Sequence, residues 1–209
     1  EPADYMSVMF LMIACVAGTG GSVLSLLCPE FHEEAKQFLR RSTKMQMVWT
    51  LASGALIALA QTCGCISFSL DEVNSGPNQS VVIANVPIVG LFFYLYSNEA
   101  LQRKQLIGCC LIVAGVLCMS GVGQGHFESG SFLWICVSTL FYAASIITIR
   151  FTADAQLPER PKSLAIVLSS GVLGFLLLRT FLCSRLWIEL SLSFLVWPLL
   201  NALASMLGL

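Results

Sequence analysis

The chain has 209 residues, of which 56% are hydrophobic and only 11% charged, and its formal net charge is −1. Soluble domains carry about 25% charged residues, so a water-soluble chain of this size lacks the polar surface needed to cover its apolar residues. The composition therefore excludes an ordinary soluble domain and predicts an integral membrane protein with membrane lipid as a partner. No basic run with interleaved aromatic residues is present, so nucleic acid is not expected as a partner.

Seven apolar segments are long enough to cross a bilayer, because a spanning helix needs about 20 apolar residues. In chain order they are residues 5–27, 46–70, 79–97, 105–121, 131–151, 163–182 and 190–207. The runs are too long for the strands of a membrane barrel and lack their alternation. The sequence therefore predicts an all-α fold, a polytopic transmembrane helical bundle of about seven spans.

Lysine and arginine are concentrated in alternate connections. Connection 28–45 holds four of them, and connections 98–104 and 152–162 hold two each, whereas 71–78 and 122–130 hold none and the last connection holds only Arg185. Because cytoplasmic loops are enriched in Lys and Arg, we predict that 28–45, 98–104 and 152–162 are cytoplasmic in a multi-pass protein with its N-terminus outside. Which membrane holds the protein is not predicted.

Connection 28–45 has an amphipathic pattern. Phe31, Ala35, Phe38 and Leu39 share one face of a helix, and the charged residues lie largely elsewhere. This pattern predicts a helix lying in the membrane interface. A plain cytoplasmic extension of the preceding span is the alternative, and the sequence leaves both open.

Span 131–151 carries a stripe of hydroxyl groups. Ser138, Tyr142 and Ser145 follow an i, i+4, i+7 spacing, which Thr148 and Thr152 extend. Polar groups inside a membrane face water-filled cavities or other helices, so the stripe either lines a polar cavity or forms interhelical hydrogen bonds.

Two other spans carry amides. Gln61 lies in the interior of span 46–70, and Asn85 precedes Pro87 in span 79–97. Pro87 cannot donate to the carbonyl of Ile83, so it predicts a kink. Transporters bind substrates at such broken helices, although a tolerated kink with Asn85 bonded to a neighbour is the alternative. The candidate cavity contacts are therefore Asn85, Gln61, Ser138, Tyr142 and Ser145.

Residues 79–121 carry a degenerate motif in which a proline in one span is followed by a terminal glutamate and a glycine-containing second span. Its positions are Pro87, Glu99, Leu101, Gln105, Gly108, Leu111, Ile112, Gly115 and Val116. This motif resembles the repeats of the EamA-like branch of the drug/metabolite transporter superfamily. Residues 130–151 resemble the first span of that family's second repeat, with Tyr142, Ala143 and Arg150 at matching positions.

The resemblance implies a ten-helix fold of two inverted repeats. Residues 1–121 would form the first EamA-like repeat without its first helix, and residues 130–209 part of the second. One helix would then precede Glu1 and two would follow Leu209. The implied function is a permease that moves a small metabolite by alternating access through a central polar cavity. The alternative is a non-transporting membrane scaffold or subunit, or the remnant of a longer carrier.

Charged groups are scarce in the spans. No Asp, Glu or His lies near a span centre, which favours a neutral or zwitterionic substrate and disfavours an enzyme. Glu99 lies at a helix end beside Arg103 and Lys104, so we expect it to be structural. The cysteines lack the spacing of a zinc site, and neither a metal nor a cofactor is expected. Small-residue stripes on several spans predict close helix packing and leave a homodimer open.

Overall fold

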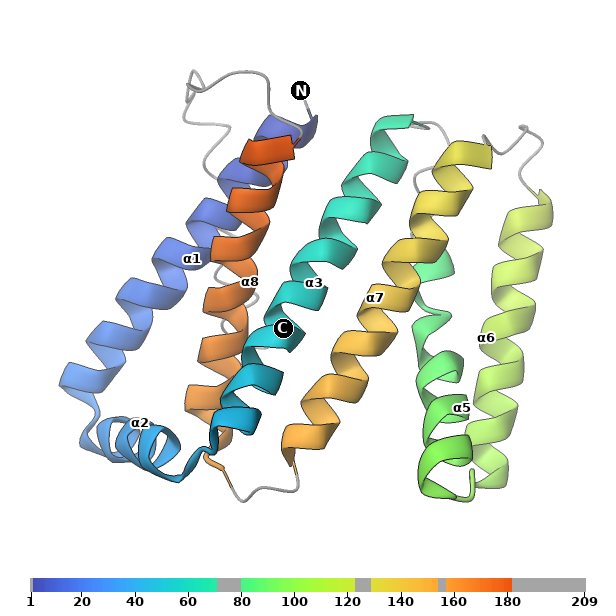
Figure 1. Cartoon of the computed structure of the whole chain (residues 1–209). Coiled ribbons are helices and arrows are strands. Elements are labelled where there is room, and N and C mark those ends of the chain that lie inside the picture. Colours follow the sequence, from blue (N-terminus) through green and yellow to red (C-terminus); the bar gives the residue numbers. More distant parts are fainter. Residues whose placement is uncertain (1, 71–79, 123–128, 154–156, 182–209) are drawn as a thin grey trace. The chain divides into compact units, whose positions relative to one another are not determined.

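The computed structural model describes residues 2–70, 80–122, 129–153 and 157–181, and every long element in these ranges is a helix (Figure 1). The helices are α1 (Pro2–Leu27), α2 (Pro29–Arg41), α3 (Lys44–Leu70), α5 (Asn85–Ser97), α6 (Arg103–Val122), α7 (Ser129–Ala153) and α8 (Glu159–Phe181). The predicted all-α fold is therefore confirmed. The ten-helix inverted-repeat arrangement and its division at 121–130 stay predictions.

Five helical segments are long and apolar enough to cross a membrane. They are Val8–Leu27, Lys44–Leu70, Ser80–Ser97, Gly130–Ala153 and Glu159–Leu178, and they coincide with five of the predicted spans. The predicted run 105–121 is occupied by α6, a continuous helix of 20 residues. The predicted span 190–207 lies outside the described residues, as do Arg185 and connection 71–78.

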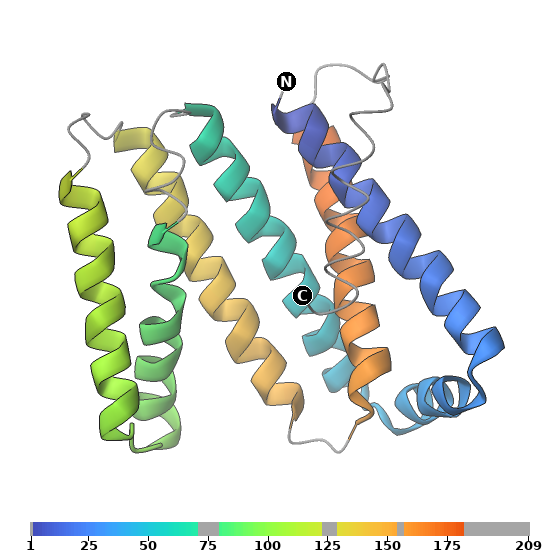
Figure 2. The ribbon, with the colours of Figure 1, turned by 180° about the vertical axis from the view of Figure 1, so that it is seen from behind.

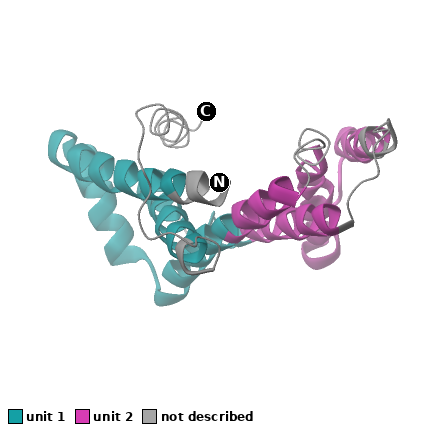
Figure 3. Cartoon of the chain, turned by 90° about the horizontal axis from the view of Figure 1, so that it is seen from above, with its two compact units in different colours: residues 1–58, 148–209 teal, residues 59–147 magenta. Residues whose placement is uncertain are grey.

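The chain divides into two compact units, residues 1–58 with 148–209 and residues 59–147 (Figure 3). We call them unit 1 and unit 2. The long helices α3 and α7 contribute residues to both units, so each unit is described by itself.

Unit 1 is built on the pairing of α1 with α8. Glycines on α8 allow the close approach: a Cβ added at Gly171 would lie 2.6 Å from the backbone nitrogen of Ala14, and one at Gly174 would overlap the ring of Phe10. Phe10 is fully buried, and Met9 and Ile13 form a small core with Val167. Small residues thus bring two distant parts of the chain into backbone contact.

In unit 1, α2 is a separate helix that crosses the end of the α1–α8 pair (Figures 1 and 2). Cys28 has an extended backbone and Pro29 occupies the first turn, where its missing N–H costs nothing. Phe31 and Phe38 are buried, as the amphipathic pattern predicts, although Leu39 is exposed. A plain extension of the preceding span is therefore wrong, and α2 is a distinct amphipathic helix.

The start of α3 is fixed by a reciprocal cap in unit 1. The backbone N–H of Thr43 donates to Gln46 Oε1 at 2.8 Å, and the N–H of Gln46 donates to Thr43 Oγ1 at 3.3 Å. At this same end of the unit, Trp49 packs against Phe151 with a centroid distance of 6.0 Å, and Arg160 lies 3.8 Å from Glu34. Connections 28–45 and 152–162 therefore meet at one end of unit 1, which agrees with their predicted common side.

Unit 2 contains the adjoining parts of α3 and α7, together with α5 and α6. The helices α3 and α7 run antiparallel, with Ser67 against Ser131 and Ala60 against Ser138. The helices α5 and α6 form a hairpin whose tip begins at Asn98. Asn98 has a φ of 51°, a left-handed conformation that asparagine tolerates at the end of a helix.

Candidate functional site

The two predicted cavity residues with the largest side chains, Gln61 and Tyr142, meet between α3 and α7 of unit 2. A side-chain hydrogen bond links them. The Gln61 Oε1 atom is buried and has no hydrogen-bond partner among the described residues, so the amide nitrogen is the group that contacts Tyr142. The sequence proposed both residues separately, and the structure brings them together as one polar pair.

The two predicted serines are engaged in helix packing. The Ser138 hydroxyl donates to the carbonyl of Ala60 on α3 at 2.7 Å, and the Ser145 hydroxyl donates to the carbonyl of Tyr142 on its own helix at 2.8 Å. Both side chains are almost fully buried. Of the two roles that the sequence left open for this stripe, Ser138 performs interhelical bonding and thereby places Tyr142 against Gln61.

Sequence reasoning missed Ser67 and Ser131, whose hydroxyl groups bond α3 and α7 to each other reciprocally. The signal was a seven-residue spacing. On α7 the buried hydroxyls recur at Ser131, Ser138, Ser145 and Thr152, and on α3 the fully buried small residues recur at Ser53, Ala60 and Ser67. A seven-residue repeat of small residues is the pattern of a close, left-handed helix pair.

The predicted break at Pro87 is present. The helical turn that starts at Ser80 ends in a non-helical turn at Ile83 and Ala84, and α5 begins at Asn85, with Pro87 in its first turn. The carbonyl of Ile83, to which Pro87 cannot donate, is not left free, because it accepts the N–H of Val86 at 3.2 Å. A short-range turn bond replaces the helical bond that proline cannot make.

Asn85 does not join the polar pair by any hydrogen bond in the described part of the chain. It is half-buried at the first position of α5. The segment before it is tied to α7, since the hydroxyl of Thr139 lies 3.4 Å from the carbonyl of Val81. The broken helix therefore contacts the same helix that carries Tyr142.

The remaining motif residues lie on the α5–α6 hairpin of unit 2. Glu99 is exposed at the tip, and its backbone N–H donates to the carbonyl of Phe93 at 3.4 Å. A Cβ added at Gly108 or Gly115 would meet no described atom within 4 Å. Neither glycine is therefore required for packing in this part of the chain.

Metal ligands are not gathered in the described residues, where no group of three or more His, Cys, Asp or Glu is arranged to hold an ion. The cysteines described there are all free thiols. The polar pair of unit 2 is uncharged: it consists of a phenol and an amide whose oxygen lacks a donor.

Fold and site together define a class, a helical protein with several helices suited to cross a membrane and a half-buried, uncharged polar pair. The chain matches no family model, no curated protein and no solved structure.

Proposed function

We propose that the protein is a multi-pass membrane carrier for a small neutral or zwitterionic solute, and that Gln61 and Tyr142 contact the solute. The observation that carries the proposal is the buried Gln61 Oε1 atom without a donor. A buried acceptor without a partner costs about 1–3 kcal/mol, and that cost is recovered when a ligand supplies the missing N–H or O–H.

The chemistry of the pair limits the substrate. The Tyr142 hydroxyl donates and accepts, and the Gln61 oxygen accepts, so a solute bearing a hydroxyl, amine or amide group satisfies both side chains. Inside a membrane an ionised group needs a counter-charge, and the pair supplies none. We therefore propose that the solute is neutral or zwitterionic.

The broken helix at Ile83 and Ala84 supports a carrier because transport requires an element that bends. One segment is tied to α7 through Val81 and Thr139, while α5 continues beyond the break. Transporters place substrate sites at such interruptions. In the EamA-like arrangement that the sequence resembles, the two repeats would rock against each other around this site, with Asn85 at its edge.

The competing proposal is a non-transporting membrane scaffold or subunit. The hydrogen bond from the Ser138 hydroxyl to the carbonyl of Ala60 favours this role, because that hydroxyl then has no proton to donate to a solute. The two proposals assign different roles to the Gln61 Oε1 atom, which lacks a donor: in a carrier it binds the solute, and in a scaffold it binds none.

A pair of substitutions separates these roles. We expect the double variant Gln61→Leu, Tyr142→Phe to lose uptake in reconstituted vesicles supplied with a panel of neutral and zwitterionic metabolites. Its free energy of unfolding should be unchanged or higher, because the unsatisfied oxygen is removed together with its neighbour. Ser69→Ala, on the same helix but exposed, is the matched control. Unchanged uptake in the double variant would favour the scaffold.

The proposed orientation, with 28–45, 98–104 and 152–162 cytoplasmic, is testable separately. Single cysteines introduced at residues 74 and 100 of a chain lacking its native cysteines should react with an impermeant reagent from opposite compartments. Reaction of both from the same side would exclude the proposed topology.

A further inference from the structure

Unit 1 contains an open groove of about 580 Å³ between α1, α2 and α8. The helices α1 and α8 diverge toward α2, which closes the wide end (Figures 1 and 2). Gly21, Ser25, Phe31, Phe38, Leu164 and Leu168 are among the residues that line it. The volume lies within the roughly 300–1,000 Å³ range of small-molecule sites.

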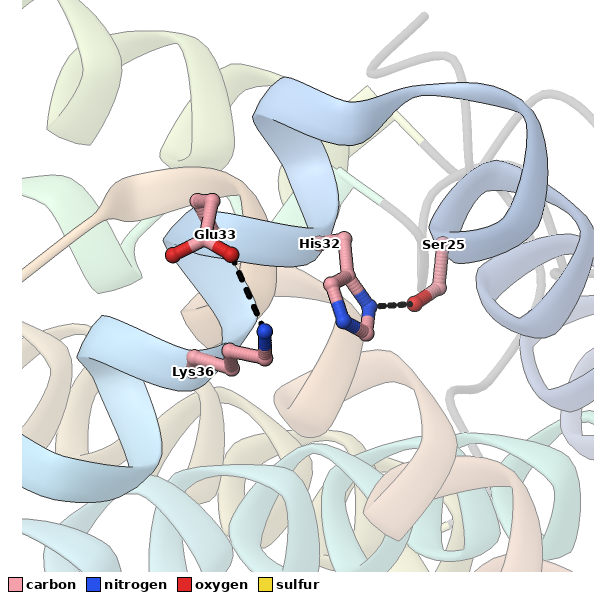
Figure 4. Close-up of polar contacts among 4 residues, drawn as sticks. All are labelled: Ser25, His32, Glu33 and Lys36. Carbon is pink, nitrogen blue, oxygen red and sulfur yellow. Dashed lines mark hydrogen bonds and ion pairs between the residues drawn. The ribbon is translucent and has the colours of Figure 1, made fainter.

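The wall of this groove has no free hydrogen-bonding side chain for a polar molecule. Its only polar side chains are Ser22 and Ser25, and both are already bonded. The Ser22 hydroxyl donates to the carbonyl of Gly18 at 2.8 Å, and the Ser25 hydroxyl lies 2.9 Å from Nδ1 of His32 (Figure 4). A polar solute would lose its hydration without replacement, whereas a hydrocarbon chain loses nothing.

The surroundings of the groove indicate the source of that hydrocarbon. Both α1 and α8 are long and apolar enough to span a membrane, and α2 is an amphipathic helix with Phe31 and Phe38 turned toward them. Leu26, Leu27 and Leu39 are exposed around the junction, at 84%, 74% and 64%. Amphipathic helices of this kind lie at the boundary between headgroups and acyl chains.

The charges at this end of unit 1 favour an anion. Glu33 and Glu34 are engaged by Lys36 at 3.0 Å and by Arg160 at 3.8 Å. Arg40 and Arg41 directly follow the groove residues Phe38 and Leu39, and neither makes an ion pair with any described residue. Basic residues beside an apolar groove at a helix end attract lipid phosphates.

We propose that the groove holds one acyl chain of an anionic phospholipid, taken from the leaflet in which α2 lies, with its phosphate on Arg40 and Arg41. The lipid is a bound structural ligand that fills the gap between α1 and α8. This site is independent of the Gln61–Tyr142 pair, because it lies wholly within unit 1.

The test uses the full chain in phosphatidylcholine vesicles that contain a trace of phosphatidylserine with a photoactivatable acyl chain. We expect labelling to concentrate on peptides 17–26 and 161–168, beyond that of the exposed α6 residues Leu106 and Leu111, which serve as the reference for lipid not held in a groove. Unlabelled phosphatidylserine should compete. The matched phosphatidylcholine probe should label the groove no more than it labels α6.

Two kinds of variant sharpen the result. Ala35→Trp on α2 and Ala165→Trp on α8 fill the groove from two different helices, so each should abolish groove labelling while labelling of α6 persists. If one variant fails to fold, the other still tests the site. The double variant Arg40→Gln, Arg41→Gln should weaken competition by phosphatidylserine about tenfold or more. The matched control, Arg103→Gln with Lys104→Gln, should not change it.

Three results would overturn the proposal. Equal labelling of groove and α6 would show that no lipid is held there, and equal labelling of the groove by both probes would remove the role of the phosphate. An acyl chain released from Cys28 by hydroxylamine would assign the groove to a covalent lipid instead, since cysteines in this position are acylation sites.

Discussion

Ser67 on α3 and Ser131 on α7 bond each other reciprocally. The hydroxyl of Ser67 donates to the carbonyl of Ser131 at 2.9 Å, and the hydroxyl of Ser131 donates to the carbonyl of Ser67 at 3.0 Å. Both residues are fully buried. Two small side chains thus fix the register in which the Gln61-bearing helix meets the Tyr142-bearing helix.

Enlarging one of these serines should separate the two helices. We expect Ser131→Val to cost about 1–3 kcal/mol, because the added methyl groups have no space at a fully buried contact. Ser131→Ala removes only the hydrogen bonds and should cost about 0.6 kcal/mol, the average for interhelical bonds in membranes. Equilibrium unfolding in mixed micelles measures both. Ser69→Ala should be neutral, and an equal effect of all three variants would contradict the register.

A glycine series tests the α1–α8 contact. A Cβ at Gly171 would lie 2.6 Å from the backbone nitrogen of Ala14 and 2.9 Å from the carbonyl oxygen of Phe10, and a backbone cannot move aside as a side chain can. Gly171→Ala should therefore destabilise by about 1–3 kcal/mol. Gly115→Ala, where the Cβ meets open space, should be neutral or up to about 1 kcal/mol stabilising through helix propensity. Unfolding midpoints that changed equally would exclude close packing at Gly171.

The helices themselves were predictable because their cause is local. Each signal depends on residues that are close in the sequence. These signals are the charge in the connections, the length of the apolar runs, and helix caps such as Thr43 with Gln46. The break at Pro87 was predictable for the same reason. The amphipathic face of α2 was visible in the sequence, but whether it continued the preceding span depended on the geometry at Cys28.

The pairings between helices could not be predicted in this way. Ser67 and Ser131 are 64 positions apart, and an apolar helix in lipid has no single polar face that selects its neighbour. Gln61 and Tyr142 were each identified as polar residues in apolar spans, yet their contact required the register set by the serines. The groove of unit 1 depends on the divergence of α1 from α8 and on the position of α2 across their wide end (Figure 1), and no local sequence pattern predicts either.

The ion pair on α2 gives a prediction about pH. The ammonium of Lys36 bonds the carboxylate of Glu33 at 3.0 Å and holds the pKa of Glu33 below its ordinary value of 4.5 (Figure 4). Because the folded pKa is lowered, the contribution of the pair to α2 is present above pH 4.5 and is lost as the pH falls through the lowered pKa.

Lys36→Met should therefore return the pKa of Glu33 toward 4.5. Carboxyl carbon NMR of the micelle-bound chain, titrated with acid, measures this value directly. Arg40→Gln is the control, because Arg40 acts on Glu33 only through a weaker charge interaction and should shift the pKa less. A pKa that did not respond to Lys36→Met would show that the ion pair does not persist in solution.

Pro87→Ala tests the cause of the helix break. Alanine restores an N–H that reaches the carbonyl of Ile83, which now accepts only the short-range bond from Val86. We expect slower amide hydrogen exchange over residues 84–88 and, for the one hydrogen bond gained, a rise in stability of up to about 1 kcal/mol. Pro29→Ala is the matched control, because Pro29 lies in the first turn of α2 where no helical bond is missing.

If the protein is a carrier, uptake should fall in Pro87→Ala as the bend is lost. Unchanged exchange would mean that the contact between Val81 and Thr139, rather than the proline, sets the break.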